Sequence, residues 1–233
     1  MSEQINNKYF EEIFNNVEVP LDVSEPVTMR KKQPITVIQI PNSIVKNKEI
    51  TVNAFAVYVY LKRESFRKRE DKLKLKLDHN EIKHKLGMSK ENRPLLAALQ
   101  NLHQQGLIKE EILKMPIHSP LFITLIEVES APFTQLPIEL IEQIHTIKSR
   151  GLRLLYYYES YINRKQVLRQ FAFPSFETIQ EDLGFNQNTI IKYNKLLVDN
   201  KMLKITKHKA EQGEFGFEKW NNHYFIQWDK IVS

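Results

Sequence analysis

Residues 178–206 read TIQEDLGFNQNTIIKYNKLLVDNKMLKIT, a pattern that predicts two helices joined by a tight turn. The first helix follows a capping Ser175 and ends at Gly184, because glycine tolerates the left-handed backbone that closes a helix. Asn186 is the expected cap of the second helix, over 189–201, whose apolar side chains recur on one face. These apolar residues are Ile190, Ile191, Leu196 and Leu197.

The flanking segments extend this motif in both directions. Upstream, RGLRLLYYYESYINRK (150–165) predicts a long helix and FAF (171–173) a short strand. Downstream, MLKITKHK (202–209) and WNNHYFIQW (220–228) predict a hairpin that turns around Gly213. The predicted unit is therefore helix, strand, helix-turn-helix and hairpin. The residues at helical spacing in the long helix are Leu152, Leu155, Tyr158 and Ile162.

The same motif occurs earlier, in EIKHKLGMSKENRPLLAALQNLHQQGLIKEE (81–111). Gly87 stands where Gly184 stands in the later copy, an offset of 97 positions, and the offset falls to 95 at Leu107 and Met202. The first copy therefore has two extra residues in the turn between its two short helices. A repeat of this kind indicates one supersecondary unit used twice.

The elements around the first copy follow from similar patterns. Asp78 and Glu81 form an acidic capping box for the first short helix, and Pro94 fits the first position of the second helix, over 92–105. PNSI (41–44) corresponds to PIEL (137–140) of the later copy. The remaining expected elements are a strand over 35–40, a helix over 51–66, the alternating strand LKLKL over 73–77, and strands near 107–114 and 121–127.

These elements divide the chain into three parts. Residues 1–33 are predicted to be an acidic, partly flexible arm, since prolines at 20, 26 and 34 interrupt any long helix or central strand. Residues 34–130 and 131–233 are predicted to be two similar domains. The expected fold class is α+β, mostly helical, with small antiparallel hairpins.

Composition excludes several classes of protein. The 233 residues include no cysteine, so disulfides, thiolate metal sites and a cysteine nucleophile are impossible. No apolar run reaches the ~18 residues needed to cross a bilayer, and the N-terminus has no signal-peptide pattern. We therefore expect a cytoplasmic protein without a membrane partner. Phosphate loops, nucleophile elbows and zinc-protease spacings are absent from the sequence, so we expect no enzyme, no cofactor and no metal.

Charge is unevenly distributed. Residues 1–30 hold six acids and two bases, which leaves 32 bases against 22 acids in residues 31–233. A basic body favours a polyanionic partner, because each neutralised phosphate releases condensed counterions. The run KRESFRKREDKLKLK (62–76), with eight bases and three acids, could follow a phosphate backbone or could be a solvated helix end. On charge alone, a basic protein that is simply well solvated remains an alternative.

The order helix, strand, helix-turn-helix and hairpin, carried by residues 81–111 and 178–206, resembles the winged-helix superfamily. The resemblance extends over both predicted domains. Two such domains after an N-terminal arm resemble the replication initiators of bacterial plasmids and phages, and also some bacterial transcription regulators. The resemblance implies binding of double-stranded DNA, with the second helix of each motif in a major groove and each hairpin, or wing, on the backbone.

The resemblance also implies which side chains meet DNA. Amides suit adenine, lysine suits guanine or phosphate, and the threonine methyl suits thymine. In the first copy Glu91 is a departure, because its carboxylate would repel phosphate. The alternative for both helices is an ordinary solvated polar face. The implied contacts are Asn186, Gln187, Asn188, Thr189, Lys192, Tyr193 and Lys195 in the second copy, and Ser89, Lys90, Asn92 and Arg93 in the first.

The second wing is the more cationic of the two. The first wing offers Lys109 and Lys114, but Glu110 and Glu111 offset them. Cations are favoured along phosphates and in the minor groove, so the second copy is expected to bind DNA more strongly. The bases of the second wing are Lys204, Lys207, His208, Lys209 and Lys219.

Three functions remain open at this point. A replication initiator would read repeats in duplex DNA, and a helicase or a second copy of the chain could be its partner. A transcription regulator would use the same contacts. An interaction module would instead dock another protein through the aromatic helix at 150–163. Tyr156, Tyr157 and Tyr158 could also suggest a nucleophile, although their helical spacing favours core and interface.

Overall fold

The structure is a computed structural model that describes residues 35–68, 71–117, 119–128, 132–165, 170–210 and 219–232, with backbone only at 208–210 and 219–220. The arm expected over 1–33 and the turn around Gly213 lie outside these residues. Residues 35–233 form one compact unit. The predicted division into domains at 130/131 stays a prediction, and we use it below to speak of a first and a second half.

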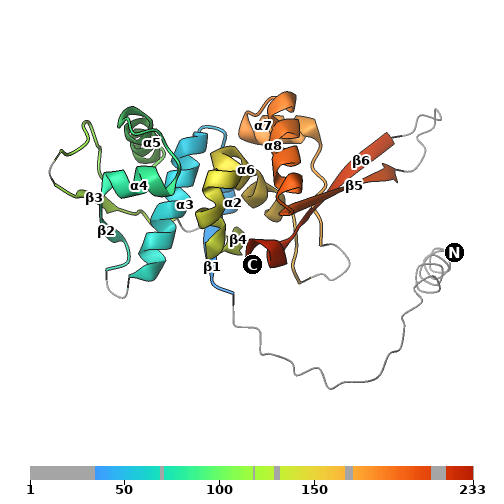
Figure 1. Ribbon diagram of the computed structural model, residues 1–233, viewed down its shortest axis with the longest axis horizontal. Coiled ribbons are helices and arrows are strands. Elements are labelled where there is room, and N and C mark those ends of the chain that lie inside the picture. The colour runs from blue at the N-terminus through green and yellow to red at the C-terminus, as the bar shows by residue number, and fades with distance from the viewer. Residues whose placement is uncertain are drawn as a thin grey trace, which may run out of the picture. The chain divides into compact units, whose positions relative to one another are not determined.

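Helices and short strands are interspersed along the chain (Figure 1). In chain order they are β1 (Val37–Pro41), α2 (Asn42–Val45), α3 (Val52–Arg67), β2 (Lys74–Leu77), α4 (His79–Lys85), α5 (Arg93–Gln104), β3 (Leu121–Thr124), β4 (Phe133–Pro137), the 3-10 helix η1 (Ile138–Gln143), α6 (Ile144–Glu159), α7 (Phe176–Leu183), α8 (Gln187–Asp199), β5 (Leu203–Ala210), β6 (Lys219–Ile226) and α9 (Trp228–Ile231).

The described strands form three antiparallel pairs, β1 with β4, β2 with β3, and β5 with β6. Helices carry most of the buried apolar side chains, so the α+β class expected from the sequence is confirmed. None of the helices in the described part of the chain is long and apolar enough to cross a membrane.

Strands β1 and β4, which are equivalent in the repeat, pair around a local approximate twofold axis. Gln39 lies opposite Gln135, and these residues occupy equivalent positions in the repeat, two places before Pro41 and Pro137. In this antiparallel pair, each half contributes its equivalent strand, and the two strands use equivalent backbone groups for their hydrogen bonds. Two equivalent backbone bonds flank the pair, from Asn42 N to the Pro132 carbonyl (3.0 Å) and from Ile138 N to the Thr36 carbonyl (2.9 Å).

Both halves also share their internal strand pairing. In the first half β2 pairs with β3, and in the second half Ala172 bridges Tyr224 of β6. The first half then has a single bridge, Ile108 to Leu125, where the second has the full β5–β6 hairpin. The two halves therefore share the order of their elements and part of their strand pairing.

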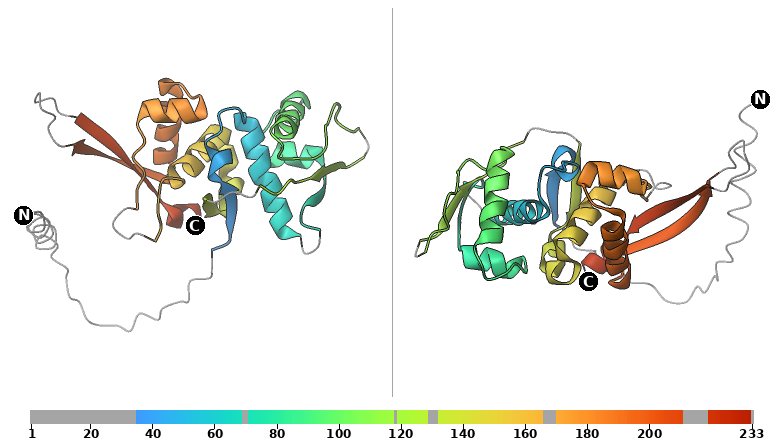
Figure 2. Two further views of the ribbon diagram at one scale, coloured as in Figure 1. Left: turned by 180° about the vertical axis from the view of Figure 1, so that it is seen from behind. Right: turned by 90° about the horizontal axis from the view of Figure 1, so that it is seen from above.

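The long helices α3 and α6 meet at the centre of the core (Figure 2). Phe55 packs edge-on against Tyr156 with ring centroids 5.6 Å apart, and both side chains are buried. Next to them, the buried Arg153 guanidinium stacks on Phe55 and donates to the backbone carbonyls of Ile50 and Asn47. A buried cation is tolerated here because carbonyl oxygens replace its water. Arg153 thereby ties α6 to the loop between α2 and α3.

Several predicted boundaries are wrong. The helix expected over 150–165 begins at Ile144 and ends at Glu159, with a break at Lys148, whose φ of 61° and ψ of 166° are non-helical. The segment 107–114 forms no strand beyond the one bridge from Ile108 to Leu125, whereas β3 pairs with β2. The expected strand 171–173 is likewise reduced to one bridge. Pro94 occupies the second position of α5, after Arg93.

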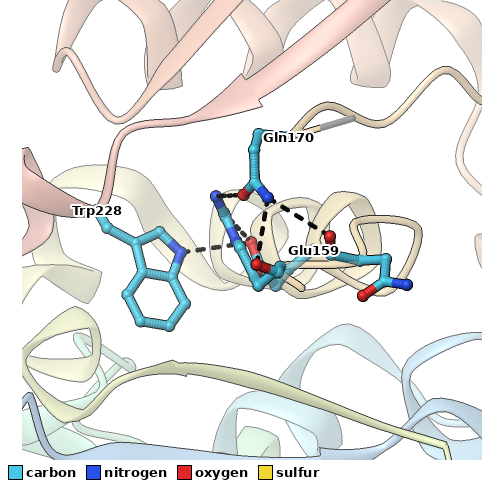
Figure 3. A network of polar contacts seen from close by, with 5 residues as sticks. Glu159, Gln170 and Trp228 are labelled. Atoms are coloured by element: carbon cyan, nitrogen blue, oxygen red, sulfur yellow. Dashed lines mark hydrogen bonds and ion pairs between the residues drawn. The ribbon is translucent and has the colours of Figure 1, made fainter. Parts of the chain in front are cut away.

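The end of α6 is held to α9 by a network of polar contacts (Figure 3). The buried Glu159 carboxylate accepts both Arg164 Nε at 2.7 Å and Trp228 Nε1 at 3.3 Å. Arg164 also donates to Gln170 Oε1 at 3.1 Å. A buried carboxylate needs such donors to offset its desolvation. The network therefore fixes the position of α9, and with it the end of β6, against the end of α6.

Candidate nucleic-acid interface

Each short-helix pair is joined by a glycine turn with a left-handed residue. Gly87 has φ +60° and Gly184 has φ +66°, a conformation that a residue with a Cβ adopts only with strain. Thr178 N donates to Ser175 Oγ at 3.2 Å, so the predicted cap of α7 is confirmed. Asp78 caps α4 by accepting from Asn80 N at 2.8 Å. These turns set the start of the second helix of each pair at the protein surface.

The predicted contact residues of the second copy lie on the solvent face of α8. Thr189 and Tyr193 are half-buried and the others are exposed. Asn186 is the helix cap, because its Oδ1 accepts from Thr189 N at 2.8 Å, so only its amide nitrogen is left to donate to a ligand. Lys195 is paired with Asp199 at 3.1 Å. The exposed residues are Asn186, Gln187, Asn188, Lys192 and Lys195.

The opposite face of α8 anchors it to α6. Ile190 and Leu197 are buried as expected, whereas Ile191 is 48% exposed, contrary to the prediction. Buried Asn194 accepts a hydrogen bond from Tyr158 Oη at 2.7 Å, which fixes the rotation of α8 about its axis. The amide-rich side of α8 therefore points away from the core.

The first copy presents fewer groups to a ligand. Ser89, Lys90 and Arg93 are exposed, as is Asn92. However, Asn92 Oδ1 accepts from buried Lys83 Nζ at 2.6 Å, and Lys83 also donates to the Lys90 carbonyl at 2.8 Å. This turn is thus fixed from inside by a lysine, and the Asn92 oxygen is already occupied.

The described parts of the two predicted wings each present two exposed lysines. In β5, Lys204 and Lys207 are exposed. The side chains of His208, Lys209 and Lys219, which were also predicted to meet DNA, lie outside the described residues. In the first half, Lys109 and Lys114 are exposed, and the Glu110 carboxylate accepts from Thr124 N at 2.6 Å. Glu110 therefore holds its own segment against β3.

A groove of about 840 Å³ lies between the two glycine turns. Figures 1 and 2 show the α4–α5 pair and the α7–α8 pair on either side of the start of α3. Gly87 and Gly184 line opposite banks, and Asn186, Thr189 and Tyr193 bring the first turns of α8 into the groove. The face that carries the predicted contacts is therefore continuous with a concave surface.

Three cationic side chains that no sequence motif predicts line the groove. Lys48 comes from the loop before α3, and Lys148 and Arg150 come from the break in α6. All three side chains are exposed. About 100 residues separate Lys48 from the other two, so no local pattern could have grouped them. The positive φ of Lys148 likewise leaves no signal in the sequence.

Other candidates from the sequence have internal roles. In the basic run 62–76, buried Arg63 pairs with Glu142, and Lys74 pairs with Asp71 at 3.3 Å. This favours the interpretation of the run as a helix end and loop. Tyr156, Tyr157 and Tyr158 are buried, so the aromatic helix does not offer the docking surface that an interaction module was expected to use. Burial raises the pKa of each of the three phenols.

Comparison with protein-family models finds no match, and comparison with curated protein sequences finds no significant similarity. In the part of the chain that the structure describes, no three His, Asp or Glu side chains come together to hold a metal ion.

Proposed function

We propose that this chain is a tandem winged-helix protein that binds double-stranded DNA in a sequence-specific manner. In this proposal α8 and α5 are the recognition helices, and β5–β6 is the main wing. The observation that carries the proposal is the start of α8, where Gln187, Asn188 and Lys192 form an exposed, amide-bearing and cationic edge. Such an edge matches the donors and acceptors of a major groove.

The build of this edge supports a role in recognition. The Asn186 cap and the Asn194–Tyr158 bond hold the helix on the core, so its backbone needs little reordering to meet a ligand. The first turn of α8 contains no acid, and the positive end of a helix dipole favours phosphate. The α5 side is weaker, since Asn92 is engaged and Glu91 is exposed.

Among DNA-binding roles, we propose replication initiation on a plasmid or another mobile element. Two copies of the motif in one chain, joined through the symmetric pairing of β1 with β4, would let it address two neighbouring stretches of duplex, as a dimer does with two subunits. A transcription regulator would use the same contacts. The cellular DNA that the protein occupies discriminates between them, because an initiator occupies iterated repeats at an origin and a regulator occupies promoters.

The test is selection of duplexes from a randomised pool by the full chain, followed by sequencing of DNA recovered with the protein from cells. The proposal expects enrichment of a motif with one strong and one weaker half, and recovery of iterated repeats. A pool that stays random after repeated rounds would refute sequence-specific recognition. A motif found singly at promoters would refute the initiator role and leave the DNA-binding role intact.

A further inference from the structure

The groove between the two glycine turns has no assigned role in the contacts described so far. It lies beside the first turns of α8 and is lined by Lys48, Lys148 and Arg150. Among the described residues that line it there is no Asp or Glu. Building on the proposed function, we propose that this groove binds the sugar-phosphate backbone of the duplex where it passes from one recognition helix, α5, to the other, α8.

Backbone dipoles add to the positive charge of the groove. The start of α3 lines it at Thr51 to Asn53, the part of α6 after the break lines it at Ser149, and the start of α8 lines it at Asn186. The first turn of a helix presents N–H groups without helical partners and carries the positive end of the helix dipole. Three helix starts and three cationic side chains thus converge on one concave surface.

Two helices also end at the groove, where three carbonyls at the end of α4 and one at the end of α7 accept hydrogen bonds within the chain. At the end of α4, Leu86 N, Gly87 N and Met88 N donate to the carbonyls of Ile82, His84 and Lys83. At the end of α7, Gly184 N donates to the Gln180 carbonyl at 2.8 Å. These bonds reduce the negative potential that the two helix ends would otherwise contribute. The balance of the groove is therefore cationic.

The wall that carries Lys48 is held rigidly from both sides. From α6, Arg153 donates to the carbonyls of Ile50 and Asn47. From α5, Asn101 Oδ1 accepts from Thr51 N at 2.9 Å, and Asn101 Nδ2 donates to the Glu49 carbonyl at 3.0 Å. This loop is consequently fixed before any ligand arrives, and preorganisation lowers the cost of binding.

The position of the groove points to a duplex rather than to a small anion. Its lining includes the glycine turns of the two motifs, and Asn186, Thr189 and Tyr193 bring the first two turns of α8 to its edge. A duplex that contacts both recognition helices, α5 and α8, must carry a phosphate strand across the space between them. The groove then fixes the spacing of the two half-sites without reading their bases.

The test compares two variants of equal net charge. One is Lys48→Gln with Arg150→Gln, which keeps the strained Lys148 backbone unchanged. The matched control is Lys165→Gln with Lys230→Gln, two exposed lysines that do not line the groove. Affinity for a mixed-sequence duplex of about 30 base pairs, some three helical turns, is measured by fluorescence anisotropy over a range of salt concentrations. Thermal unfolding of each variant checks the fold.

The groove variant should lower the log–log salt slope by about 2, since each phosphate contact contributes about 0.9. Its affinity at about 0.1 M salt should fall on the order of ten- to a hundredfold, and that of the control by much less. Equal losses in both variants would overturn the groove assignment. A normal salt slope in the groove variant, with Lys192→Ala weakened, would overturn the groove and leave the proposed function standing. No duplex binding by the unmodified chain would overturn both.

A second measurement needs no variant. Acetylation of the lysines of the unmodified chain, with and without the same duplex, is followed by mass spectrometry. The duplex should protect Lys48 and Lys148 and leave Lys165 reactive. Full reactivity of Lys48 and Lys148 in the complex would overturn the assignment.

Discussion

At the scale of single residues, Asn186 uses one half of its amide to cap α8 and leaves the other half exposed. Gln187 and Asn188, one and two places further on, have no part in the cap and project from the first turn. Lys192 lies about one turn after Asn188 and is exposed, and a lysine ammonium is suited to binding phosphate. The residues at this helix start therefore divide into one structural residue, two candidates for reading bases and one for binding phosphate.

This division predicts different effects for Gln187→Ala and Lys192→Ala. Lys192→Ala should weaken binding to selected and mixed-sequence duplexes alike and should lower the salt slope by about 1, because it removes a phosphate contact. Gln187→Ala should cost about 1–3 kcal/mol on the selected sequence and relax preference at one base pair. Competition titrations on both DNAs measure this. An equal loss on both DNAs from Gln187→Ala would contradict its assignment as a base reader.

At the scale of elements, the two glycine turns set the orientations of α5 and α8 relative to the helices that precede them. Both glycines are left-handed, so a Cβ at either position costs about 1 kcal/mol of strain. The surroundings differ. A Cβ at Gly184 meets nothing within 4 Å, whereas a Cβ at Gly87 comes within 3.1 Å of His145 Nδ1 at the start of α6.

Gly87→Ala should therefore destabilise the protein more than Gly184→Ala does. Urea unfolding should show a loss of about 1 kcal/mol for Gly184→Ala, and a larger loss for Gly87→Ala. Combining Gly87→Ala with His145→Ala should remove the excess. The same loss for the two single variants would show that His145 moves aside freely.

Elements with strong periodicity could be predicted from the sequence, and those that depend on distant partners could not. Helices α3, α7 and α8 fall within about two residues of their predicted bounds, because capping residues and apolar stripes are local signals. The strand expected at 107–114 is reduced to the bridge from Ile108 to Leu125, because a strand depends on hydrogen bonds to a partner that is distant in the sequence. The start of α6 was missed because the break at Lys148 interrupts the helical pattern.

One part of the candidate site could likewise be predicted from local patterns, and another part depends on residues that are distant in the sequence. The exposed face of α8 follows from its amphipathic pattern, since Ile190 and Leu197 occupy the core side. The groove required Lys48 and Arg150 to meet across about 100 residues, and tertiary folding alone creates that juxtaposition. Burial of the tyrosines of α6 also exceeded what one helical stripe predicts, because α3, α8 and β6 cover it on several sides.

At the scale of the whole molecule, buried tyrosines make stability sensitive to alkali. Burial raises the pKa of Tyr58 to about 12, and it also raises the pKa of Tyr156 and Tyr158. An unfolded tyrosine has a pKa of about 10. The folded state therefore holds its phenolic protons more tightly, which contributes stability that is complete below pH 10 and is lost as the pH rises further.

The free energy of unfolding should accordingly fall steeply above pH 10. Each tyrosine contributes up to about 1.4 kcal/mol per pH unit in that range. Urea unfolding at a series of pH values, with tyrosinate absorbance followed in parallel, measures the effect. Tyrosinate formation should coincide with loss of helical circular dichroism. Complete titration near pH 10 with the fold intact would contradict the burial of these side chains.

The central claim is that the start of α8 meets DNA, and the absence of cysteine from the chain allows a direct test. A single Asn188→Cys substitution accepts a photocrosslinker at one defined place, and Asp229→Cys in α9 gives a matched exposed position outside the recognition helices. With a selected duplex, we predict efficient crosslinking to bases from position 188 and little from position 229. Equal yields from the two positions, or a bound duplex that escapes crosslinking at position 188, would contradict the account.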